Sequence, residues 1–136
     1  MNIIYVDGTF DLIHVGHIEF FQKIKQKNDK LLVGVISDKN VESYKRMPII
    51  DLNNRCKMLE NIKAVDLVIK DCPFNGIPKT FIEKYNITKI FYGGDKSSWQ
   101  EHYKIPIELG IMNYIEYVHP ECSTSKIIEK IKKISN

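Results

Sequence analysis

Short apolar runs alternate with segments of helical periodicity along the whole chain, and this alternation limits the fold more than any other feature. We expect strands at 3–6, 31–36, 66–69, 89–94 and 114–118, and helices at 18–26, 53–62, 79–85, 100–109 and 125–134. Strands that alternate with helices form a parallel sheet with right-handed crossovers. The pattern therefore predicts an α/β fold with a Rossmann-like, doubly wound parallel sheet of about five strands and helices on both faces.

Two local features refine this prediction. The run Leu31–Ile36 is almost entirely apolar, as expected of a strand that is buried on both faces of a parallel sheet. Pro106 is expected to break or kink the helix predicted at 100–109. The length of 136 residues fits one domain with one core, so residues 1–136 are expected to form a single domain.

Composition excludes several classes of protein. A net charge of only +3 makes no case for a nucleic-acid partner, and no apolar run approaches the roughly 20 residues that cross a membrane. Met1–Ile4 lacks the pattern of a signal peptide, so a cytoplasmic location is expected. The cysteines Cys56, Cys72 and Cys122 are widely spaced and odd in number, which argues against a metal cluster or a disulfide framework.

Ligands of doubly wound sheets bind beyond the carboxyl ends of the strands, and the segment Gly8–His17 follows the first predicted strand. A helix N-terminus attracts phosphate through its unpaired N–H groups and its partial positive charge. His14 and His17 lie three residues apart, so they share one face of the first turn and can reach the same anion. Gly16 leaves room for a ligand against the backbone. The segment therefore predicts a site that holds a nucleotide's phosphates during transfer.

Three more segments fall at the ends of predicted strands: Ser37–Asp38, Gly93–Asp95 and Glu121–Ser125. Glycines at 93 and 94 let a ligand approach the backbone, and Asp95 could bind a ribose, a cytosine amino group or a Mg²⁺-bound water. Either Ser123 or Thr124 can cap the last helix while the helix amides meet phosphate or base.

The sequence Gly8-Thr9-Phe10-Asp11-x-x-His14-x-Gly16-His17 resembles the hallmark of the cytidylyltransferase-like group of nucleotidylyltransferases. The resemblance implies an enzyme in which a substrate phosphate oxygen attacks the α-phosphorus of a nucleoside triphosphate and pyrophosphate leaves. His14, His17 and Lys45 are the catalytic residues that it implies. The implied nucleotide-binding residues are Gly8, Thr9, Phe10, His14, Gly16, His17, Arg55, Gly93, Asp95, Cys122, Ser123, Thr124 and Ser125.

The same resemblance assigns further roles. A lysine in the loop after the second strand, here Lys45, reaches the phosphates of both substrates, and Arg55 opens the next helix and points at the nucleotide. Mg²⁺ is the implied cofactor; it is carried by the nucleotide phosphates and needs no protein ligand set. The group commonly forms homodimers, so a homodimer is expected here.

The N-terminal half resembles the phosphocholine and phosphoethanolamine cytidylyltransferases. Asp7 could hold a cationic amino-alcohol head group, and Phe74 is suited to a cation–π contact with it. The expected substrate-binding residues are Asp7, Asp11, Lys45 and Phe74. Glycerol-3-phosphate cytidylyltransferases share the compact length, but their acceptor offers no cation to Asp7.

The C-terminal motif differs from this pattern. Cytidylyltransferases of the group carry Arg-Thr-x-Gly-Ile-Ser-Thr, whereas this chain has Val118–Thr124 without the arginine and the glycine. Cys122-Ser123-Thr124 is similar instead to the heptose-1-phosphate adenylyltransferases. Three hypotheses therefore stand: a CTP-dependent enzyme that acts on a phosphorylated alcohol, an ATP-dependent adenylyltransferase that acts on a sugar phosphate, and a non-catalytic nucleotide-binding module.

Overall fold

Parallel strands form the centre of the computed structural model, which describes residues 1–93, 100–115 and 122–135. Within these ranges one sheet contains five strands in the order β3-β2-β1-β4-β5, and every neighbouring pair is parallel. The strands are β1 (Ile3–Gly8), β2 (Lys30–Val35), β3 (Leu67–Lys70), β4 (Lys89–Tyr92) and β5 (Met112–Tyr114). The predicted parallel sheet is confirmed.

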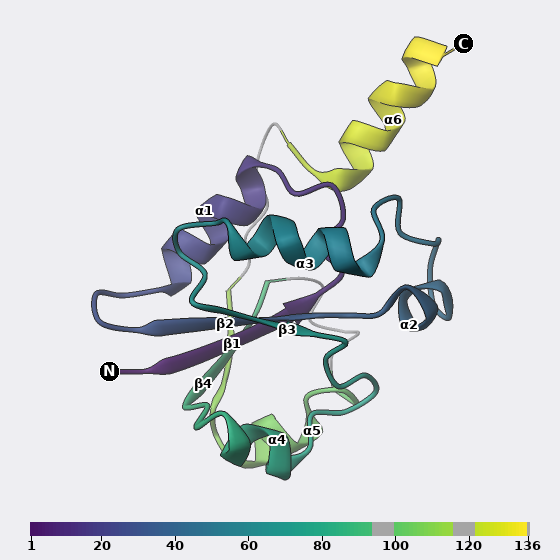
Figure 1. The fold of residues 1–136 in the computed structure, drawn as a ribbon. Helices are drawn as coiled ribbons and strands as arrows, with labels where there is room; N and C mark the ends of the chain where they lie inside the picture. Colours follow the sequence, from purple (N-terminus) through teal and green to yellow (C-terminus); the bar gives the residue numbers. More distant parts are fainter. Residues whose placement is uncertain (94–99, 116–121, 136) are drawn as a thin grey trace.

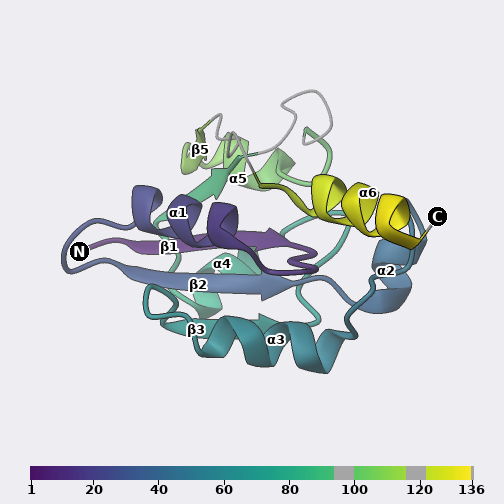
Figure 2. The same cartoon turned by 90° about the horizontal axis from the view of Figure 1, so that it is seen from above.

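Helices cover both faces of the sheet, as predicted (Figure 1). One face carries α1 (Val15–Ile24) and α3 (Leu52–Glu60), and the other carries α4 (Lys79–Lys84) and α5 (Lys104–Glu108). Figure 2 shows the remaining two, α2 (Asp38–Glu42) and α6 (Thr124–Ser135), toward the end of the sheet at which β1 and β2 terminate. The described helices thus leave the carboxyl ends of the central strands as the place where loops converge.

Several element bounds differ from the prediction. Helix α5 is shorter than the range 100–109, and Pro106 is its third residue; proline fits the first turn because the amides there have no helical acceptor. The last strand begins at Met112, where it pairs with Ile90 of β4, and residues 116–118 of the predicted strand lie outside the described residues. Helix α2 was not predicted; Ser37 caps it by accepting a hydrogen bond from the Asn40 amide.

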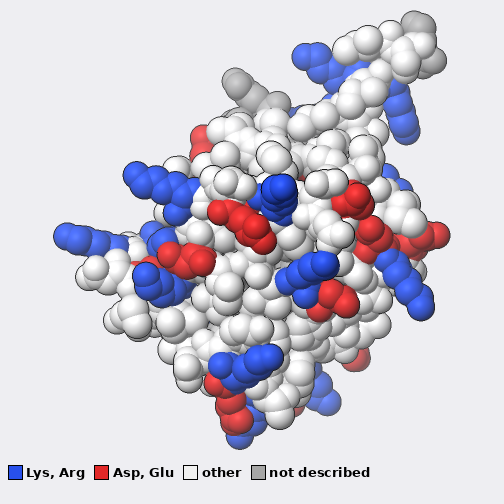
Figure 3. Space-filling view, viewed as in Figure 1, with Lys and Arg blue, Asp and Glu red and all other residues white. Residues whose placement is uncertain are grey.

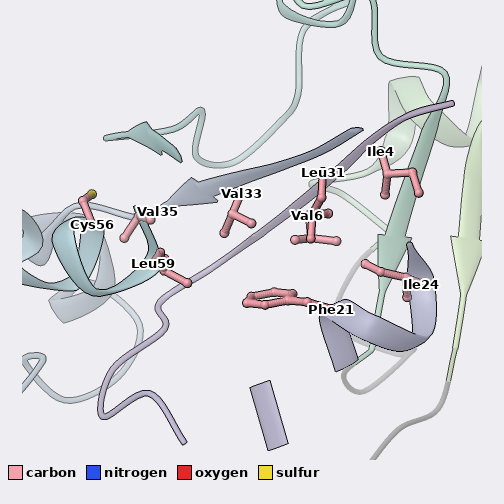
Figure 4. Packing of buried hydrophobic residues seen from close by; sticks show 9 residues of the cluster. All are labelled: Ile4, Val6, Phe21, Ile24, Leu31, Val33, Val35, Cys56 and Leu59. Carbon is pink, nitrogen blue, oxygen red and sulfur yellow. The ribbon is translucent and has the colours of Figure 1, made fainter. Parts of the chain in front are cut away.

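The core divides between the two faces because side chains alternate along each strand. On one face, Ile4 and Val6 of β1 pack with Phe21 of α1 and Leu59 of α3, all of them almost fully buried (Figure 4). On the other face, Tyr5 joins a second buried cluster beneath α4 and α5. Burial of β2 on both faces confirms the interpretation of its apolar run.

Strands are added to the sheet on both sides of β1. The chain first adds β2 and β3 on one side of β1, and then returns to add β4 and β5 on the other side. The crevice beyond the carboxyl ends of β1 and β4 is therefore a topological switch point, where doubly wound sheets bind their ligands. Figure 3 shows basic and acidic side chains interspersed over the face in view, without a stripe of one sign. None of the described helices is long and apolar enough to span a bilayer.

Candidate functional site

The loop between β1 and α1 has a strained backbone. Phe10 and Leu12 have φ values of 54° and 50°, in the left-handed region that bulky residues rarely adopt. Such a conformation persists only when surrounding contacts impose it, and it is concentrated at functional sites. The contacts of Asp11 and of the histidines at the end of the loop provide this restraint.

His14 and His17 cap helix α1 reciprocally. Nδ1 of His14 accepts a hydrogen bond from the Gly16 amide at 3.0 Å, and Nδ1 of His17 accepts from the His14 amide at 3.2 Å. Because a backbone N–H can only donate, both Nδ1 atoms are unprotonated and each neutral ring carries its proton on Nε2. The ring centroids lie 4.1 Å apart, so the two imidazoles lie side by side at the start of α1.

His17 is neutral at ordinary pH. Burial, reinforced by the neighbouring His14, lowers the pKa of His17 to about 4. Gly16, whose amide serves the cap, is buried in the first turn of the helix. A neutral imidazole with an Nε2–H offers a hydrogen-bond donor to a phosphate oxygen without the desolvation cost of a buried cation.

Asp11 organises the segment that follows α2. Its Oδ2 accepts from the Ile49 amide at 2.8 Å and from the Arg46 guanidinium at 3.1 Å, and its Oδ1 accepts from the Ile50 amide at 3.0 Å. Burial alone would raise the pKa of Asp11, but these three donors outweigh it and hold the pKa below its usual value. The backbone carbonyl of Asp11 accepts from the Thr124 hydroxyl at 3.0 Å. Asp11 therefore ties the 45–50 segment and the start of α6 to the loop after β1.

A cavity of about 430 Å³ opens at this junction. Its lining combines basic side chains, hydroxyls and an imidazole with one aromatic ring and one carboxylate: Thr9, Phe10, Asp11, His17, Lys45, Arg46, Thr124 and Ser125. Burial lowers the pKa of Lys45, and the adjacent Arg46 lowers it further. Two cations held close together in a partly desolvated cavity favour an anionic occupant.

The three hydroxyl residues at the start of α6 have different roles. Ser123 caps the helix by accepting from the Lys126 amide at 3.2 Å, while Thr124 donates to the Asp11 carbonyl and Ser125 lines the cavity. Of the two residues that the sequence offered as the cap, Ser123 or Thr124, the structure shows Ser123 in this role. Cys122, which precedes these residues, is half-buried.

Arg55 lies beneath the loop and outside the lining of this cavity. Its guanidinium donates to the Thr9 carbonyl at 2.6 Å and to the Asp38 carboxylate at 2.6 Å, and its Nε donates to the Ile50 carbonyl at 2.9 Å. The side chain has no exposed surface. Instead it reaches an adjoining cavity of about 300 Å³ whose other lining residues are Phe10, Leu12, Ile13, Ile50, Met58 and Ile127. In this structure Arg55 braces the loop after β1, and its contact with a nucleotide stays a prediction.

Asp7 points into a separate polar cluster on the other face of the sheet. Its carboxylate accepts from His102 Nε2 at 2.7 Å and from the Tyr103 hydroxyl, and the side chain is 4% exposed. Asp7 lies only two residues before Thr9, which lines the anion cavity, so the two sites are close neighbours in the sequence. Gly8 has the ring of its neighbour Phe10 packed against it.

Phe74 reaches the site through a second aromatic residue. Its ring stacks on Tyr44 with centroids 5.7 Å apart, and the Tyr44 hydroxyl lies 3.4 Å from the Thr9 hydroxyl. Lys45 Nζ lies 5.5 Å from the Tyr44 ring centroid. Gly93 has a packing role, because a Cβ there would lie 2.8 Å from the ring of Phe20 on α1. Asp95 and Glu121 lie outside the described residues.

Sequence reasoning did not single out Arg46, Tyr44, His102 or Tyr103. Arg46 could have been found beside Lys45, since consecutive cations in one loop are a signal for an anion. His102 and Tyr103 carry no such signal, because the sheet brings them to a carboxylate 95 and 96 positions earlier in the chain. The described residues contain no group of three His, Cys, Asp or Glu side chains placed to hold a metal ion.

The chain is similar to a protein family and to several named proteins. A family model described as cytidylyltransferase-like matches residues 5–130. An "Ethanolamine-phosphate cytidylyltransferase" of Dictyostelium discoideum is 36% identical over 136 residues, which cover 95% of this chain and 37% of the relative. A "Bifunctional protein HldE" of Helicobacter hepaticus is 31% identical over 97% of this chain and 27% of the relative. The chain thus spans well under half the length of these two relatives.

A shorter relative matches over most of its length. An "FAD synthase" of Thermococcus sibiricus is 37% identical over 91% of this chain and 88% of the relative. Among solved structures, a lipopolysaccharide core biosynthesis protein from Thermoplasma volcanium superposes with a TM-score of 0.68 at 25% identity, covering 88% of this chain and 99% of that one. The α/β architecture described above is therefore shared with a solved structure that is matched over nearly its whole length.

Proposed function

The chain belongs to the cytidylyltransferase-like family, and from this premise we propose that it is a CTP-dependent nucleotidyltransferase. It transfers CMP to a phosphorylated small alcohol and releases pyrophosphate. Phosphoethanolamine and phosphocholine are the favoured acceptors, ahead of glycerol 3-phosphate, in keeping with the cytidylyltransferase name of the Dictyostelium relative.

One observation carries the proposal: three elements that are distant in sequence converge on one anion-binding cavity. His17 comes from the start of α1, Lys45 and Arg46 come from the segment after α2, and Thr124 and Ser125 come from the start of α6. A triphosphate and a phosphorylated acceptor together bring several negative charges. Cations, hydroxyls and a helix N-terminus at one place are the groups that can hold both anions close together.

The proposed reaction needs no covalent enzyme intermediate. A phosphate oxygen of the acceptor attacks the α-phosphorus of the nucleotide, a new P–O bond forms, and the bond to the bridging oxygen of pyrophosphate breaks. His14 and His17 donate hydrogen bonds to phosphate oxygens from Nε2, and Lys45 neutralises charge shared by the two substrates. Preorganised donors of this kind act mainly by stabilising charge that develops in the transition state.

Mg²⁺ is part of the proposal as a companion of the nucleotide. The donor set fits this role, because Asp11, the carboxylate of the cavity lining, already accepts from Arg46 and two amides. When bound to the phosphates, Mg²⁺ shields their charge and orients them. Homodimer formation, which the family resemblance implies, is also a proposal, and light scattering of the purified protein tests it.

The second candidate is an ATP-dependent adenylyltransferase that acts on a sugar phosphate. The Cys122-Ser123-Thr124 sequence favours it, as does the similarity to HldE. The relative named FAD synthase, which is matched over most of its length and whose named product contains adenosine, likewise supports ATP as the nucleotide. A non-catalytic nucleotide-binding module is the third candidate, and binding without pyrophosphate release would identify it.

The test measures pyrophosphate release by the purified protein with CTP or ATP, Mg²⁺ and each acceptor in turn. We expect turnover with CTP and an amino-alcohol phosphate; turnover with ATP and a sugar phosphate alone would overturn the first choice. His17→Asn is the sharpest variant, because the Asn Oδ1 can still accept from the His14 amide while the Nε2 donor is lost. It should lower kcat by about 10²-fold, whereas exposed Lys79→Ala should leave kcat unchanged.

A further inference from the structure

A buried polar cluster lies on the α4–α5 side of the sheet and is not used by the phosphate chemistry. The Asp7 carboxylate is its centre, with the Nε2 of His102 at 2.7 Å and the Tyr103 hydroxyl on its two oxygens. His102 is also tied from behind, since its Nδ1 accepts from the Gly76 amide at 2.9 Å. The side chain of Asp7 is 4% exposed, and that of His102 is 21% exposed.

The bond from Gly76 determines what His102 can do. A backbone amide donates, so Nδ1 of His102 carries no proton, and the neutral ring must donate to Asp7 from Nε2. The imidazole therefore connects the 72–77 segment, which carries Phe74, to the carboxyl end of β1. The carbonyl of His102 strengthens this connection by accepting from the Ile77 amide at 3.2 Å.

The other groups that face Asp7 are also neutral. Burial raises the pKa of the Cys72 thiol to about 12, and burial raises the pKa values of the Tyr5 and Tyr103 phenols far above their ordinary range. Among the described residues, no Lys or Arg pairs with the Asp7 carboxylate. A buried carboxylate whose partners are neutral donors is suited to a cation supplied from outside.

The geometry also limits the kind of cation. A carboxylate has about four lone-pair positions, and His102 and Tyr103 use two of them. A primary ammonium brings N–H donors that can use the rest, whereas a quaternary ammonium has none and depends on open aromatic faces. Phe74 stacks on Tyr44 at an interplanar angle of 26°, so one face of its ring is already covered.

Resting on the proposed function, we propose that His102 is a positioning residue for the acceptor's head group. With Tyr103 it holds the Asp7 carboxylate in the orientation that accepts hydrogen bonds from a primary ammonium. The protein therefore selects a phosphorylated primary amino alcohol over its quaternary, trimethylated counterpart. His102 acts through Asp7 and does not touch the reacting phosphates.

Two variants separate the bonds of His102. In His102→Gln the amide nitrogen can reach the position of Nε2 and still donate to Asp7. In His102→Asn the side-chain oxygen can replace Nδ1 and still accept from Gly76, but the donor to Asp7 is lost. Lys79→Ala, on the exposed surface of α4, is the control. The measurements are kcat and KM for phosphoethanolamine, phosphocholine and CTP, together with calorimetric binding of phosphoethanolamine alone.

We expect the wild-type protein to have a kcat/KM for phosphoethanolamine at least about tenfold above that for phosphocholine, as the loss of one charge-assisted hydrogen bond implies. His102→Asn should raise the KM for phosphoethanolamine by about tenfold and leave the KM for CTP and the kcat almost unchanged. His102→Gln should stay within about threefold of wild type in all three quantities. Because a mere folding defect would change the CTP parameters too, this split between substrates distinguishes positioning from structure.

Two results overturn the inference while leaving the proposed function intact: equal use of the two acceptors by an active wild-type protein, or an unchanged acceptor KM in His102→Asn. If the wild type releases no pyrophosphate from CTP, the proposed function fails. The calorimetric arm then decides the inference separately. Phosphoethanolamine binding that weakens in His102→Asn and persists in His102→Gln supports it, and absence of binding overturns it.

Discussion

Single side chains at this site act mostly through the backbone of other segments. Asp11 shows this clearly: both of its carboxylate oxygens hold the segment after Lys45, while its carbonyl holds the start of α6. His17 likewise uses one ring nitrogen to complete the cap of α1, which leaves the other as the donor toward phosphate. One residue type in one position therefore meets a structural and a chemical requirement together.

The low pKa of His17 has a consequence for stability. In the unfolded chain a histidine takes up a proton below pH about 6.5, whereas folded His17 stays neutral until the pH approaches about 4. Between these two pH values the unfolded chain binds one more proton than the folded chain. The contribution of His17 to the free energy of unfolding therefore falls as the pH drops. Between pH 7 and 5, wild type should lose about 2 kcal/mol more than His17→Asn does. Urea unfolding at both pH values measures this, and equal losses would contradict it.

Asp11→Asn should destabilise the protein although the side chain keeps its shape. Both carboxylate oxygens accept hydrogen bonds, and an amide group presents only one acceptor, so a buried donor loses its partner at a cost of about 2 kcal/mol. The pKa of Asp11 is lowered in the folded state, so its contribution is present above the unfolded value of about 3.9 and is lost as the pH falls further. The difference between wild type and variant in urea unfolding should be full at pH 7 and shrink at pH 3. A constant difference would refute this account.

At the scale of elements, the end of each helix determines the direction in which the chain continues to the next strand. Helix α5 illustrates how local chemistry fixes such an end. The Gly110 amide donates to the Ile107 carbonyl at 3.0 Å and the Ile111 amide donates to the Pro106 carbonyl at 3.2 Å, which is the Schellman pattern. Gly110 has a φ of 72°, so the chain can turn directly into β5.

Gly110→Ala tests this helix end. A Cβ at Gly110 would have nothing within 4 Å, so any cost arises from the left-handed backbone alone, at about 1 kcal/mol. Asparagine tolerates this conformation better, so Gly110→Asn should cost less than Gly110→Ala. Thermal unfolding of the three proteins measures the order. An alanine variant as stable as wild type would show that this φ does not restrict the residue.

At the scale of the whole molecule, the sheet order places chemistry from remote parts of the chain at one edge. Parallel strands end in the same direction, and the reversal at β1 opens a crevice between loops that grow from opposite sides. The anion cavity lies on the α1 side of this edge, and the Asp7 cluster lies on the α5 side. Close packing within the sheet and against its helices keeps the anion cavity and the Asp7 cluster in fixed positions relative to each other.

Gly34 of β2 is packed tightly between Tyr5 of β1 and Cys72, which follows β3. A Cβ at Gly34 would lie 2.2 Å from the Tyr5 hydroxyl and 2.8 Å from the Cys72 Cβ. Gly34→Ala should therefore destabilise the protein by about 2–3 kcal/mol through overpacking. The double variant Gly34→Ala/Tyr5→Phe removes the shortest contact and should recover part of the loss. A double-mutant cycle by urea unfolding measures the coupling, and strict additivity would contradict this explanation.

Much of the fold could be predicted from the sequence because its signals are local. The apolar runs and helical periods identify the strands, the layers and the parallel sheet, although they give the bounds less well. Pro106 was expected to interrupt a helix, but the helix begins only two residues before it. Helix α2 went unpredicted because five residues are too few to show a helical period.

The sequence by itself determined the doubly wound architecture, a helix that starts at two histidines after β1, and the presence of basic and hydroxyl residues at later strand ends. Only the tertiary structure decided which of these residues share a cavity. It buried Arg55 against Asp38, placed Arg46 on Asp11, and brought His102 and Tyr103 to Asp7. The physical reason is range: periodicity and capping depend on neighbours a few residues apart, whereas these contacts join segments 17 to 96 residues apart, which meet only when the strands pair.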